Sequence, residues 1–410
     1  MTISMNGSLV GEESTAAVIS AVETAGSGGG HQLHVLTLTP FYPHQNDSAA
    51  GCFVAEPLAH LQDLGVESSV IAVQPFHRGR MTASQLVHPS SWVHYVSLPG
   101  VLGLTISGPL LSKQIFTSVS RLHLQCPIDL IHAHAPLPCG YAAFLLQRKL
   151  GIPFVVSVHG REVFSDSAGG PWARNRCRRM AKMVYRSARR VICVSETVRQ
   201  ELRNGVPEAD CTVVYNGTDS TLFRPVTGID APLVLSVGNL LPSKGHEVLL
   251  RAFAKVAPSH PRLAWQIIGI GPEYGRLRLV ARELGIEDRA QFLGRLNRDA
   301  VAEAMRRCAV FALPSSCEAL GCVYLEAMAA GKAVIGCHGQ GIAEIVRNGQ
   351  NGFLIEPGNI EELAGVLGLL LREASLRARV GAAARATILE GLTLEHQAAH
   401  LARVYRECVA

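Results

Sequence analysis

The chain has 410 residues, of which 48% are hydrophobic and 17% are charged. Single hydrophobic cores stop growing at roughly 250 to 300 residues, so this length predicts two globular domains, and the composition excludes general disorder. The 38 Lys and Arg residues against 33 Asp and Glu give a net charge of +5. That balance excludes a dedicated nucleic-acid binder but is compatible with an anionic ligand.

The N-terminal charge, the cysteines and the apolar runs indicate the cellular compartment of the protein. No Lys or Arg precedes Arg78, so the N-terminus lacks the basic region of a secretory signal, and residues 1–30 are expected to form a disordered leader. The 11 cysteines contain no CxxC pair and are expected to be reduced thiols. No apolar stretch approaches the roughly 20 residues of a membrane span. A cytoplasmic protein, at most peripheral to a membrane, is therefore predicted.

Short runs of Val, Ile and Leu begin after residue 30 and alternate with segments of helical period, which is typical of parallel sheets covered by helices. The strands expected in a first doubly wound domain are 34–38, 70–73, 129–133, 154–158, 190–194 and 212–215. A helix is expected after the first strand, because Val54, Leu58 and Leu61 recur at helical spacing.

A bridge rich in Pro, Gly and Asp at 223–232 precedes a second series of the same kind. Its expected strands are 233–237, 265–268, 290–293, 310–313, 333–335 and 353–355. The predicted fold class is therefore α/β, with domains at 31–225 and 226–390. Ligands of open α/β sheets bind at the carboxyl ends of strands, so an anion in a cleft between the domains is expected.

The segment 235–250 predicts a strand, a flexible loop and a helix. Gly238 and Gly245 would let the backbone approach a ligand, and Lys244 stands where the free amide groups of the helix begin. This arrangement suits a diphosphate. An exposed lysine beside an ordinary turn is the alternative on this segment alone.

A second glycine-rich turn follows the strand at 265–268. Its glycines are Gly269, Gly271 and Gly275, and Tyr274 occupies the position where a nicotinamide fingerprint has its third glycine. A tight turn between strand and helix is therefore favoured over a dehydrogenase site.

Two glutamates, Glu318 and Glu326, are separated by seven residues around the predicted start of a helix near Gly321. Carboxylates accept hydrogen bonds from vicinal hydroxyls of a sugar, and the backbone amides of residues 320–322 suit a phosphate. A sugar nucleotide offers both groups. Two solvated glutamates on a helix remain the alternative for this motif alone.

Taken together, these segments resemble glycosyltransferase family 4, whose members are retaining, nucleotide-sugar-dependent enzymes of the two-domain GT-B fold. The resemblance spans about residues 33 to 405. It rests on Glu318 and Glu326 with Glu326-Ala-Met-Ala-Ala-Gly331, Val237-Gly-Asn-Leu with Lys244-Gly245, Gly269-Ile-Gly-Pro272, Phe292-Leu-Gly294, Asp129-Leu-Ile-His-Ala-His134, Val158-His-Gly160 and Tyr215-Asn-Gly-Thr-Asp219.

The resemblance implies roles for residues on both sides of the cleft. Glu318 would contact hydroxyls of the transferred sugar, Glu326 would hold the ribose, Lys244 would neutralise the diphosphate, and His159 would lie near the donor sugar. The loop around Gly51 would close over the diphosphate. The other donor-binding residues expected are Gly238, Asn239, Leu296, Leu320, Gly321 and Cys322. His132 and His134 are expected to be structural, and residues 391–410 should form a helix that returns to the first domain.

The chain departs from the family pattern at three positions. Asn239 stands where Arg is frequent, which would leave more of the diphosphate charge to Lys244. Ala319 replaces a common Gly after the first glutamate. Glu162, after Arg161, retains the acidic character that is frequent close to the family histidine.

Cleavage of the anomeric bond leaves negative charge on the diphosphate, which Lys244 and oriented amides would stabilise. In similar enzymes retention is explained by front-face attack, in which the leaving phosphate helps to accept the proton of the acceptor. No cofactor and no metal are expected, because no DxD-type cluster presents a cation site.

The segment from Arg174 to Arg190 holds eight Lys or Arg residues, no acid, and interspersed apolar residues. It could hold the enzyme on an anionic membrane where a lipid-linked acceptor waits. A solvated helix face, or a contact with a phosphate-bearing acceptor, is the alternative.

The predicted function is transfer of a sugar from a UDP- or GDP-sugar to a saccharide, a lipid-linked glycan or a small molecule, in polysaccharide or cell-envelope synthesis. Three alternatives stay open. A sugar-nucleotide epimerase would use the same fold. A phosphorylase would need a lysine-bound pyridoxal phosphate, for which the sequence has no motif. A non-catalytic partner of another transferase would fit the changes at Asn239 and Ala319.

Overall fold

The structure is a computed structural model of the chain. It describes residues 32–44, 47, 49–76, 90–98, 100–160, 170–226 and 231–410, apart from the side chains at 90 and 101. The expected leader at 1–30 and the pair Arg161 and Glu162 lie outside the described residues.

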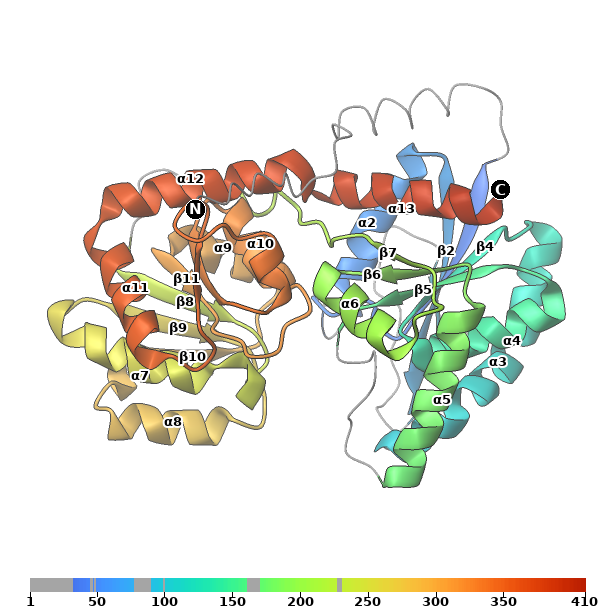
Figure 1. Cartoon of the computed structure of the whole chain (residues 1–410), viewed down its shortest axis with the longest axis horizontal. Helices are drawn as coiled ribbons and strands as arrows, with labels where there is room; N and C mark the ends of the chain where they lie inside the picture. The colour runs from blue at the N-terminus through green and yellow to red at the C-terminus, as the bar shows by residue number, and fades with distance from the viewer. Residues whose placement is uncertain are drawn as a thin grey trace, which may run out of the picture.

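The first domain is built on a seven-stranded parallel sheet of order β3-β2-β1-β4-β5-β6-β7 (Figure 1). Its strands are β1 (Leu33–Thr39), β2 (Val66–Pro75), β3 (Ser90–Tyr95), β4 (Leu130–His134), β5 (Phe154–Val158), β6 (Arg190–Cys193) and β7 (Cys211–Val213). The helices are α2 (Cys52–Asp63), α3 (Gly100–Gln125), α4 (Tyr141–Leu150), α5 (Pro171–Ser187) and α6 (Glu196–Gly205). All six predicted strands are confirmed, whereas β3 was not predicted.

The second domain is built on a six-stranded parallel sheet of order β10-β9-β8-β11-β12-β13. Its strands are β8 (Leu233–Val237), β9 (Ala264–Ile268), β10 (Ala290–Gly294), β11 (Val310–Ala312), β12 (Ala333–Cys337) and β13 (Phe353–Ile355), as predicted. Its helices are α7 (His246–Val256), α8 (Tyr274–Glu283), α9 (Arg298–Arg307), α10 (Cys322–Ala329), α11 (Ile360–Arg372) and α12 (Ala374–Gly391).

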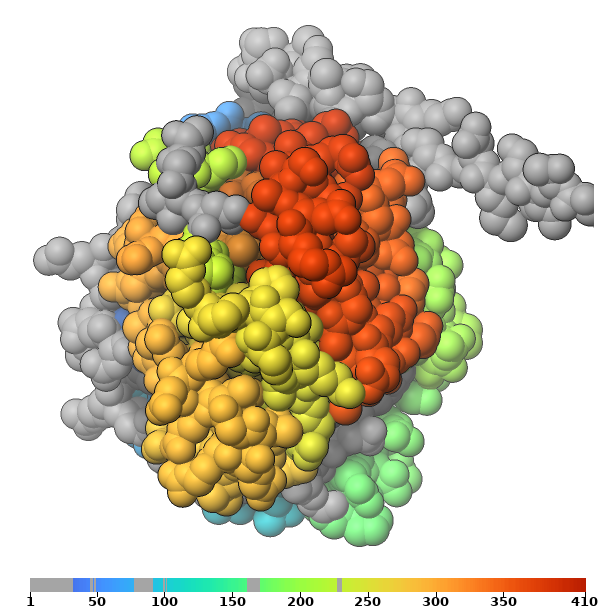
Figure 2. Space-filling model, turned by 90° about the vertical axis from the view of Figure 1, so that its left-hand side faces the viewer, coloured from blue at the N-terminus to red at the C-terminus, as the bar shows by residue number. Residues whose placement is uncertain are grey.

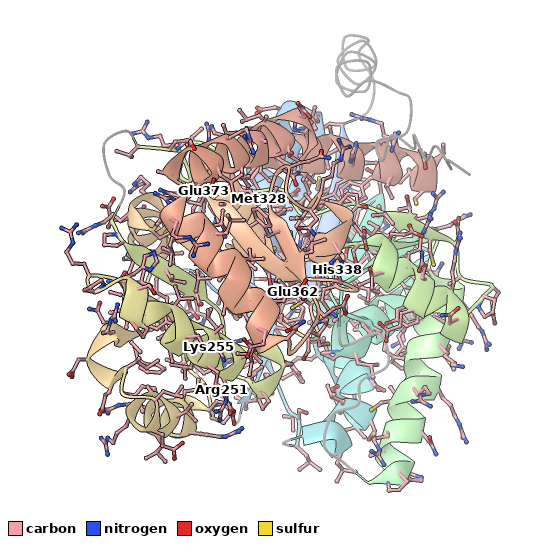
Figure 3. All side chains as sticks on the ribbon, turned by 60° about the vertical axis from the view of Figure 1, so that its left-hand side comes forward. Arg251, Lys255, Met328, His338, Glu362 and Glu373 are labelled. Atoms are coloured by element: carbon pink, nitrogen blue, oxygen red, sulfur yellow. The ribbon has the colours of Figure 1, made fainter. Side chains whose placement is uncertain are left out.

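The apolar runs become strands because helices cover both faces of each sheet. Every residue of β1, β4 and β5 is buried, and so is every residue of β12. On the outer side of the second domain, α7 packs against α11, as the end-on view in Figure 2 shows. Lys255 of α7 pairs with Glu361 of α11 at 2.8 Å, and Figure 3 shows Lys255 on this outer surface.

The helices α12 and α13 (Leu394–Val409) follow one another along the top of Figure 1, α12 over the second domain and α13 over the first. The buried residues Leu401 and Tyr405 of α13 share one hydrophobic core with Val54 and Leu58 of α2. Residues 394–409 therefore pack on the first domain, and the turn before them lies beside the connection between the domains, where the N–H of Thr218 donates to the carbonyl oxygen of Leu392 at 3.0 Å.

Candidate active site

A cavity of 1210 Å³ lies between the two domains and is lined by residues of both. Its first-domain wall comes from the loops after β1 and β4 and from β2 and β3, and its second-domain wall comes from the loops after β8, β9, β10 and β11. These loops follow the carboxyl ends of parallel strands. The cavity therefore lies where open α/β sheets bind their ligands.

Three helices near this cavity begin at glycines of positive φ, and two of these glycines, Gly51 and Gly321, line it. Gly51 caps α2, Gly245 caps α7 and Gly321 caps α10, and no side chain of the described residues caps any of the three. The first backbone N–H groups of a helix lack partners within the helix, and its dipole is positive at that end. The three ends together favour an anionic ligand.

Lys244 and Glu318 form an ion pair at the cavity wall, with side chains 19% and 14% exposed. Close packing of the loop before α7 brings them together. A Cβ atom at Gly245 would lie 2.1 Å from the carbonyl oxygen of Pro314, so only glycine lets this loop pack against the segment that leads to Glu318.

The backbone at Glu318 is fixed from a neighbouring segment. Its N–H donates to Oε1 of Gln340 at 2.8 Å, and its carbonyl oxygen accepts a bond from the N–H of Gly341 at 3.1 Å. Ser315 Oγ donates to the Glu318 carboxylate at 3.4 Å. Contacts within the protein therefore hold the Glu318 carboxylate at the cavity.

Glu326 lies in α10, and its side chain is only 7% exposed. It is not among the residues that line the cavity. Nη1 of Arg298 donates to its Oε1 at 2.5 Å. Burial raises the pKa of Glu326, and the charge of Arg298 opposes that rise. The predicted contact with a ribose would thus have to share this carboxylate with Arg298.

His159 follows β5, as expected, but it lines a separate cavity of 20 Å³ rather than the wall of the large one. The rings of Phe53 and Phe41 lie 4.8 and 5.7 Å from the imidazole, and both phenylalanines line the large cavity. That His159 lies near the donor sugar therefore stays a prediction.

The backbone beside His159 nevertheless reaches the second domain. A Cβ atom at Gly160 would lie 2.8 Å from Cβ of Ala319. The unusual alanine after the first glutamate therefore contacts the turn after β5, and this contact brings the two domains together directly beside Glu318.

The other predicted donor-binding residues divide into two groups. Those that line the cavity are Gly51, Gly238, Asn239, Leu296, Gly321 and Cys322. Leu320, in contrast, is 1% exposed and lies in the hydrophobic core, so its side chain does not contribute to the wall. Asn216 of the first domain donates a hydrogen bond to Sγ of Cys322 at 3.2 Å.

Two family models match the chain in sequence. The model for glycosyltransferase family 4 matches residues 50–222, and the model for glycosyl transferases group 1 matches residues 219–387. An uncharacterised glycosyltransferase of Methanocaldococcus jannaschii is 30% identical over 256 residues, which are 62% of this chain and 68% of the relative. The chain belongs to glycosyltransferase family 4.

Other relatives and solved structures agree with this assignment. D-inositol 3-phosphate glycosyltransferase of Streptomyces scabiei is 30% identical over 303 residues, which are 68% of this chain and 67% of that enzyme. Sucrose-phosphate synthase of Thermosynechococcus elongatus superposes with a TM-score of 0.77 at 21% identity, covering 92% of this chain and 98% of that one. HepE of Anabaena, solved with UDP-glucose, gives a TM-score of 0.70 at 20% identity, with coverages of 92% and 100%. The glycosyltransferase thus has the GT-B fold.

Sequence reasoning missed two ion pairs that join the domains of this glycosyltransferase. Arg295 pairs with Asp47, and both line the cavity. Arg298 lies 2.8 Å from the Glu56 carboxylate through Nε and donates to it through Nη2 at 2.9 Å. Burial raises the pKa of Glu56 to about 7, with Arg298 acting in the opposite direction. The partners are 248 and 242 positions apart, so no local pattern could have revealed them.

A third missed contact is made by Glu344, in the single-turn helix Gly341–Glu344. Its carboxylate accepts hydrogen bonds from the N–H groups of Glu196 and Thr197 at 2.7 Å and from the hydroxyl of Tyr215 at 3.0 Å. An acid from the second domain therefore caps the first turn of α6 in the first domain, where the helix dipole favours negative charge.

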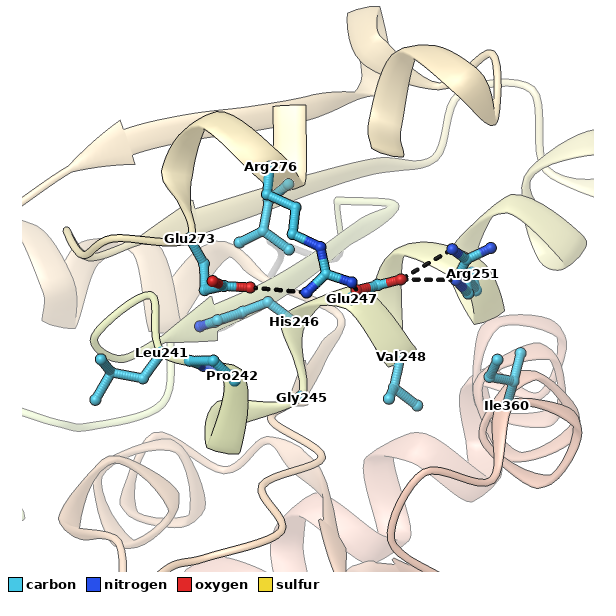
Figure 4. A pocket seen from close by; sticks show the side chains of 11 residues that line it. Leu241, Pro242, Gly245, His246, Glu247, Val248, Arg251, Glu273, Arg276 and Ile360 are labelled. Carbon is cyan, nitrogen blue, oxygen red and sulfur yellow. Dashed lines mark hydrogen bonds and ion pairs between the residues drawn. The ribbon is translucent and has the colours of Figure 1, made fainter. Parts of the chain in front are cut away.

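A further pocket of 270 Å³ lies near the start of α7 (Figure 4). Its charged residues are paired with each other, because Glu247 contacts Arg251 at 2.8 Å and Arg276 at 2.5 Å, and Glu273 contacts Arg276 at 3.2 Å. The start of α7 thus lines this pocket, whereas Lys244 and the starts of α2 and α10 line the cavity between the domains.

Proposed function

We propose that this glycosyltransferase moves a sugar from a nucleoside diphosphate donor of the UDP or GDP type, with retention of anomeric configuration. The observation that carries the proposal is the meeting of Lys244, Glu318 and the starts of α2 and α10 at one cavity. A lysine and helix N-termini suit a diphosphate, and a fixed carboxylate suits sugar hydroxyls. The likeness to HepE, which was solved with UDP-glucose, supports a nucleotide-sugar donor.

In the proposed reaction the bond between the anomeric carbon and the diphosphate oxygen breaks, and a bond from that carbon to an acceptor oxygen forms on the same face. The acceptor proton passes to the departing phosphate. Lys244 and the N–H groups at the helix starts stabilise the negative charge that develops there. Glu318 would exchange its bond to Lys244 for sugar hydroxyls as the phosphates arrive.

We also propose that no metal or other cofactor takes part. Within the described ranges, no group of three or more His, Cys, Asp and Glu residues is arranged to hold a metal ion. The charge on the leaving group would instead be balanced by Lys244 and the helix ends.

His159 is proposed to contact the donor sugar only after Phe53 turns aside. Burial lowers the pKa of His159 to about 4, so the ring is neutral near pH 7. A neutral imidazole can donate or accept one hydrogen bond to a hydroxyl, and it adds no charge to that of Lys244.

A thermal-shift panel tests the donor proposal. We expect UDP- or GDP-sugars to raise the Tm, because a ligand at 100 times its Kd adds about 2.7 kcal/mol to the folded state. Transfer activity with the best donor should be unchanged by EDTA. A panel of UDP-, GDP- and ADP-sugars that leaves the Tm unchanged would contradict the donor, and loss of activity in EDTA would contradict metal independence.

The acceptor is proposed to be a glycan or a lipid-linked saccharide of a polysaccharide or cell-envelope pathway. The first-domain wall of the cavity is largely aromatic and aliphatic, with Trp92, Tyr95, Leu98, Leu104 and Leu137. Such a wall can stack on sugar rings and can also accommodate an apolar chain.

Peripheral membrane contact is proposed through the basic helix α5. Among the described residues, no helix has both the length and the apolar character to cross a bilayer. Arg174, Arg178 and Arg179 are exposed on α5, and the exposed Trp172 lies at its N-terminal end. The helix thus presents positive charge and an aromatic ring on one surface.

Replacing these three arginines by glutamine should weaken binding to phosphatidylserine vesicles about a hundredfold, since each basic residue near such a surface contributes about 1 kcal/mol. Sedimentation with vesicles measures the effect. The matched control replaces Arg276, Arg278 and Arg282 of α8, which pair with acids. Equal vesicle binding by the two triple variants would exclude α5 as the contact.

A further inference from the structure

Arg298 stands at the junction of the two domains and contacts one carboxylate from each. It is the first residue of α9 and reaches Glu56 on α2 of the first domain and Glu326 on α10 of the second. The side chains of Arg298, Glu56 and Glu326 are 14%, 26% and 7% exposed. Phe223 lies under the guanidinium, 4.9 Å from ring centroid to Cζ, and holds its plane.

The arrangement places two acids and one base in a poorly solvated junction. The pKa of Glu56 is raised to about 7 by burial and, further, by the charges of Glu326 and Asp219, while Arg298 opposes the rise. Cys52 of the same helix also faces Arg298, Glu56 and Glu326. Without the guanidinium, two carboxylates would face each other across the boundary between the domains, and like charges in a low-dielectric site repel.

The same segment of the second domain makes another contact with the first domain. Arg295, three residues before Arg298, pairs with Asp47. Asp47 and Glu56 lie on either side of Gly51, the start of α2 at the cavity. Arg295 and Arg298 therefore contact the first domain on both sides of Gly51 in sequence.

We propose that Arg298 is a positioning residue that permits the Gly51 loop to close beside Glu326 by neutralising Glu56 and Glu326 together. The proposal rests on the proposed function, in which the cavity binds a nucleotide sugar. Arg298 itself need not contact the donor. It acts by allowing the domain that carries Gly51 to approach the carboxylate that would hold the ribose.

A double-mutant cycle tests this coupling. Arg298→Gln should raise the donor KM about tenfold with a much smaller change in kcat, because the loss is in closure and not in the reacting groups. Glu56→Gln alone should change KM less than threefold. Glu56→Gln added to Arg298→Gln should restore most of the lost affinity, although Glu56 lies in the other domain, and such non-additivity is the signature of direct coupling.

Glu303→Gln on the same helix is the matched control, since Glu303 is half exposed and pairs within α9 with Arg306. Added to Arg298→Gln it should restore nothing. Should Arg298→Gln not fold, Arg298→Lys is measured instead: it keeps the charge without the two-pronged geometry, so its KM should stay within about threefold, and a tenfold rise would contradict neutralisation as the role of Arg298. Binding of UDP or GDP, whichever raises the Tm of the unaltered enzyme, is measured by calorimetry beside KM.

Restoration by Glu56→Gln and none by Glu303→Gln would support the proposal. An unchanged KM in Arg298→Gln, or a KM that Glu56→Gln fails to restore, would overturn it and confine Arg298 to the second domain. Failure of the unaltered enzyme to bind any nucleotide would instead overturn the proposed function, so the two failures are distinguishable.

Discussion

Replacement of Lys244 by alanine should lower kcat/KM for sugar transfer by a factor on the order of 1000. Removing one preorganised group that stabilises developing negative charge typically reduces a rate by a hundred- to a thousandfold. Lys244 is the lysine in the cavity lining, and the neighbouring Asn239 carries no charge. The measurement is donor-dependent transfer at saturating acceptor, with Tm recorded in parallel.

The matched control is Lys255→Ala on α7, the helix that follows Lys244. Lys255 is half exposed, pairs with Glu361 at 2.8 Å and projects from the outer surface in Figure 3. Its loss should change kcat/KM less than twofold, because an exposed ion pair contributes little to stability. Activity of Lys244→Ala within tenfold of the unaltered enzyme would contradict the assignment of the diphosphate to this loop.

The fold could be predicted where burial alone determines the local structure. Strands such as β5 and β12 are buried along their whole length because helices cover both faces of the sheet. Their apolar runs can therefore be recognised in the sequence. β3, with the sequence Ser-Ser-Trp-Val-His-Tyr, lies at the sheet edge and pairs only with β2. An edge strand has fewer buried positions, and its mixed polarity gave no comparable signal.

Within the candidate site, the residues that could be predicted are those that act from their own segment. Lys244 and Glu318 each follow a strand and precede a helix, and the parallel sheet brings such positions to one edge. Glu326 and His159 lie on the predicted elements, but their partners within the protein were not predicted. Arg298 engages Glu326, and Phe53 covers His159.

The difference has a physical cause. The partner of a buried charge is selected by tertiary packing, and Arg298 is the first residue of α9, whose sequence does not indicate which carboxylates it meets. The cover over His159 depends on the rotation of one aromatic side chain at the start of α2. Neither property is expressed in the spacing of residues along the chain.

Acidification from pH 6.5 to pH 5 should strongly destabilise the protein through three stacked histidines. His134 lies 4.2 Å from His132 and 5.2 Å from His159 between ring centroids. Burial lowers the pKa of His132 to about 3 and that of His159 to about 4, and it places the pKa of His134 well below its usual range. The rings are therefore neutral when folded but bind protons below about pH 6.5 when unfolded.

The sign follows from the unfolded chain holding more protons below pH 6.5, so the stabilising contribution is complete above that pH and is lost as the pH falls. Each ring contributes about 1.4 kcal/mol per pH unit, or on the order of 4 kcal/mol per unit for the three. His132 also bonds Tyr405 of α13 and Ser157 at 2.7 Å, so the loss should loosen α13 from the first domain.

Denaturant unfolding between pH 7.5 and pH 5 measures the slope, and hydrogen exchange of α13 reports its release. His134→Gln removes one titrating ring, and its slope should be smaller by about a third. His338→Gln is the comparison, because His338 lies in the second domain, outside the stack. Equal slopes in the two variants would contradict the prediction, because they would mean that His134 takes up its proton as readily in the folded as in the unfolded protein.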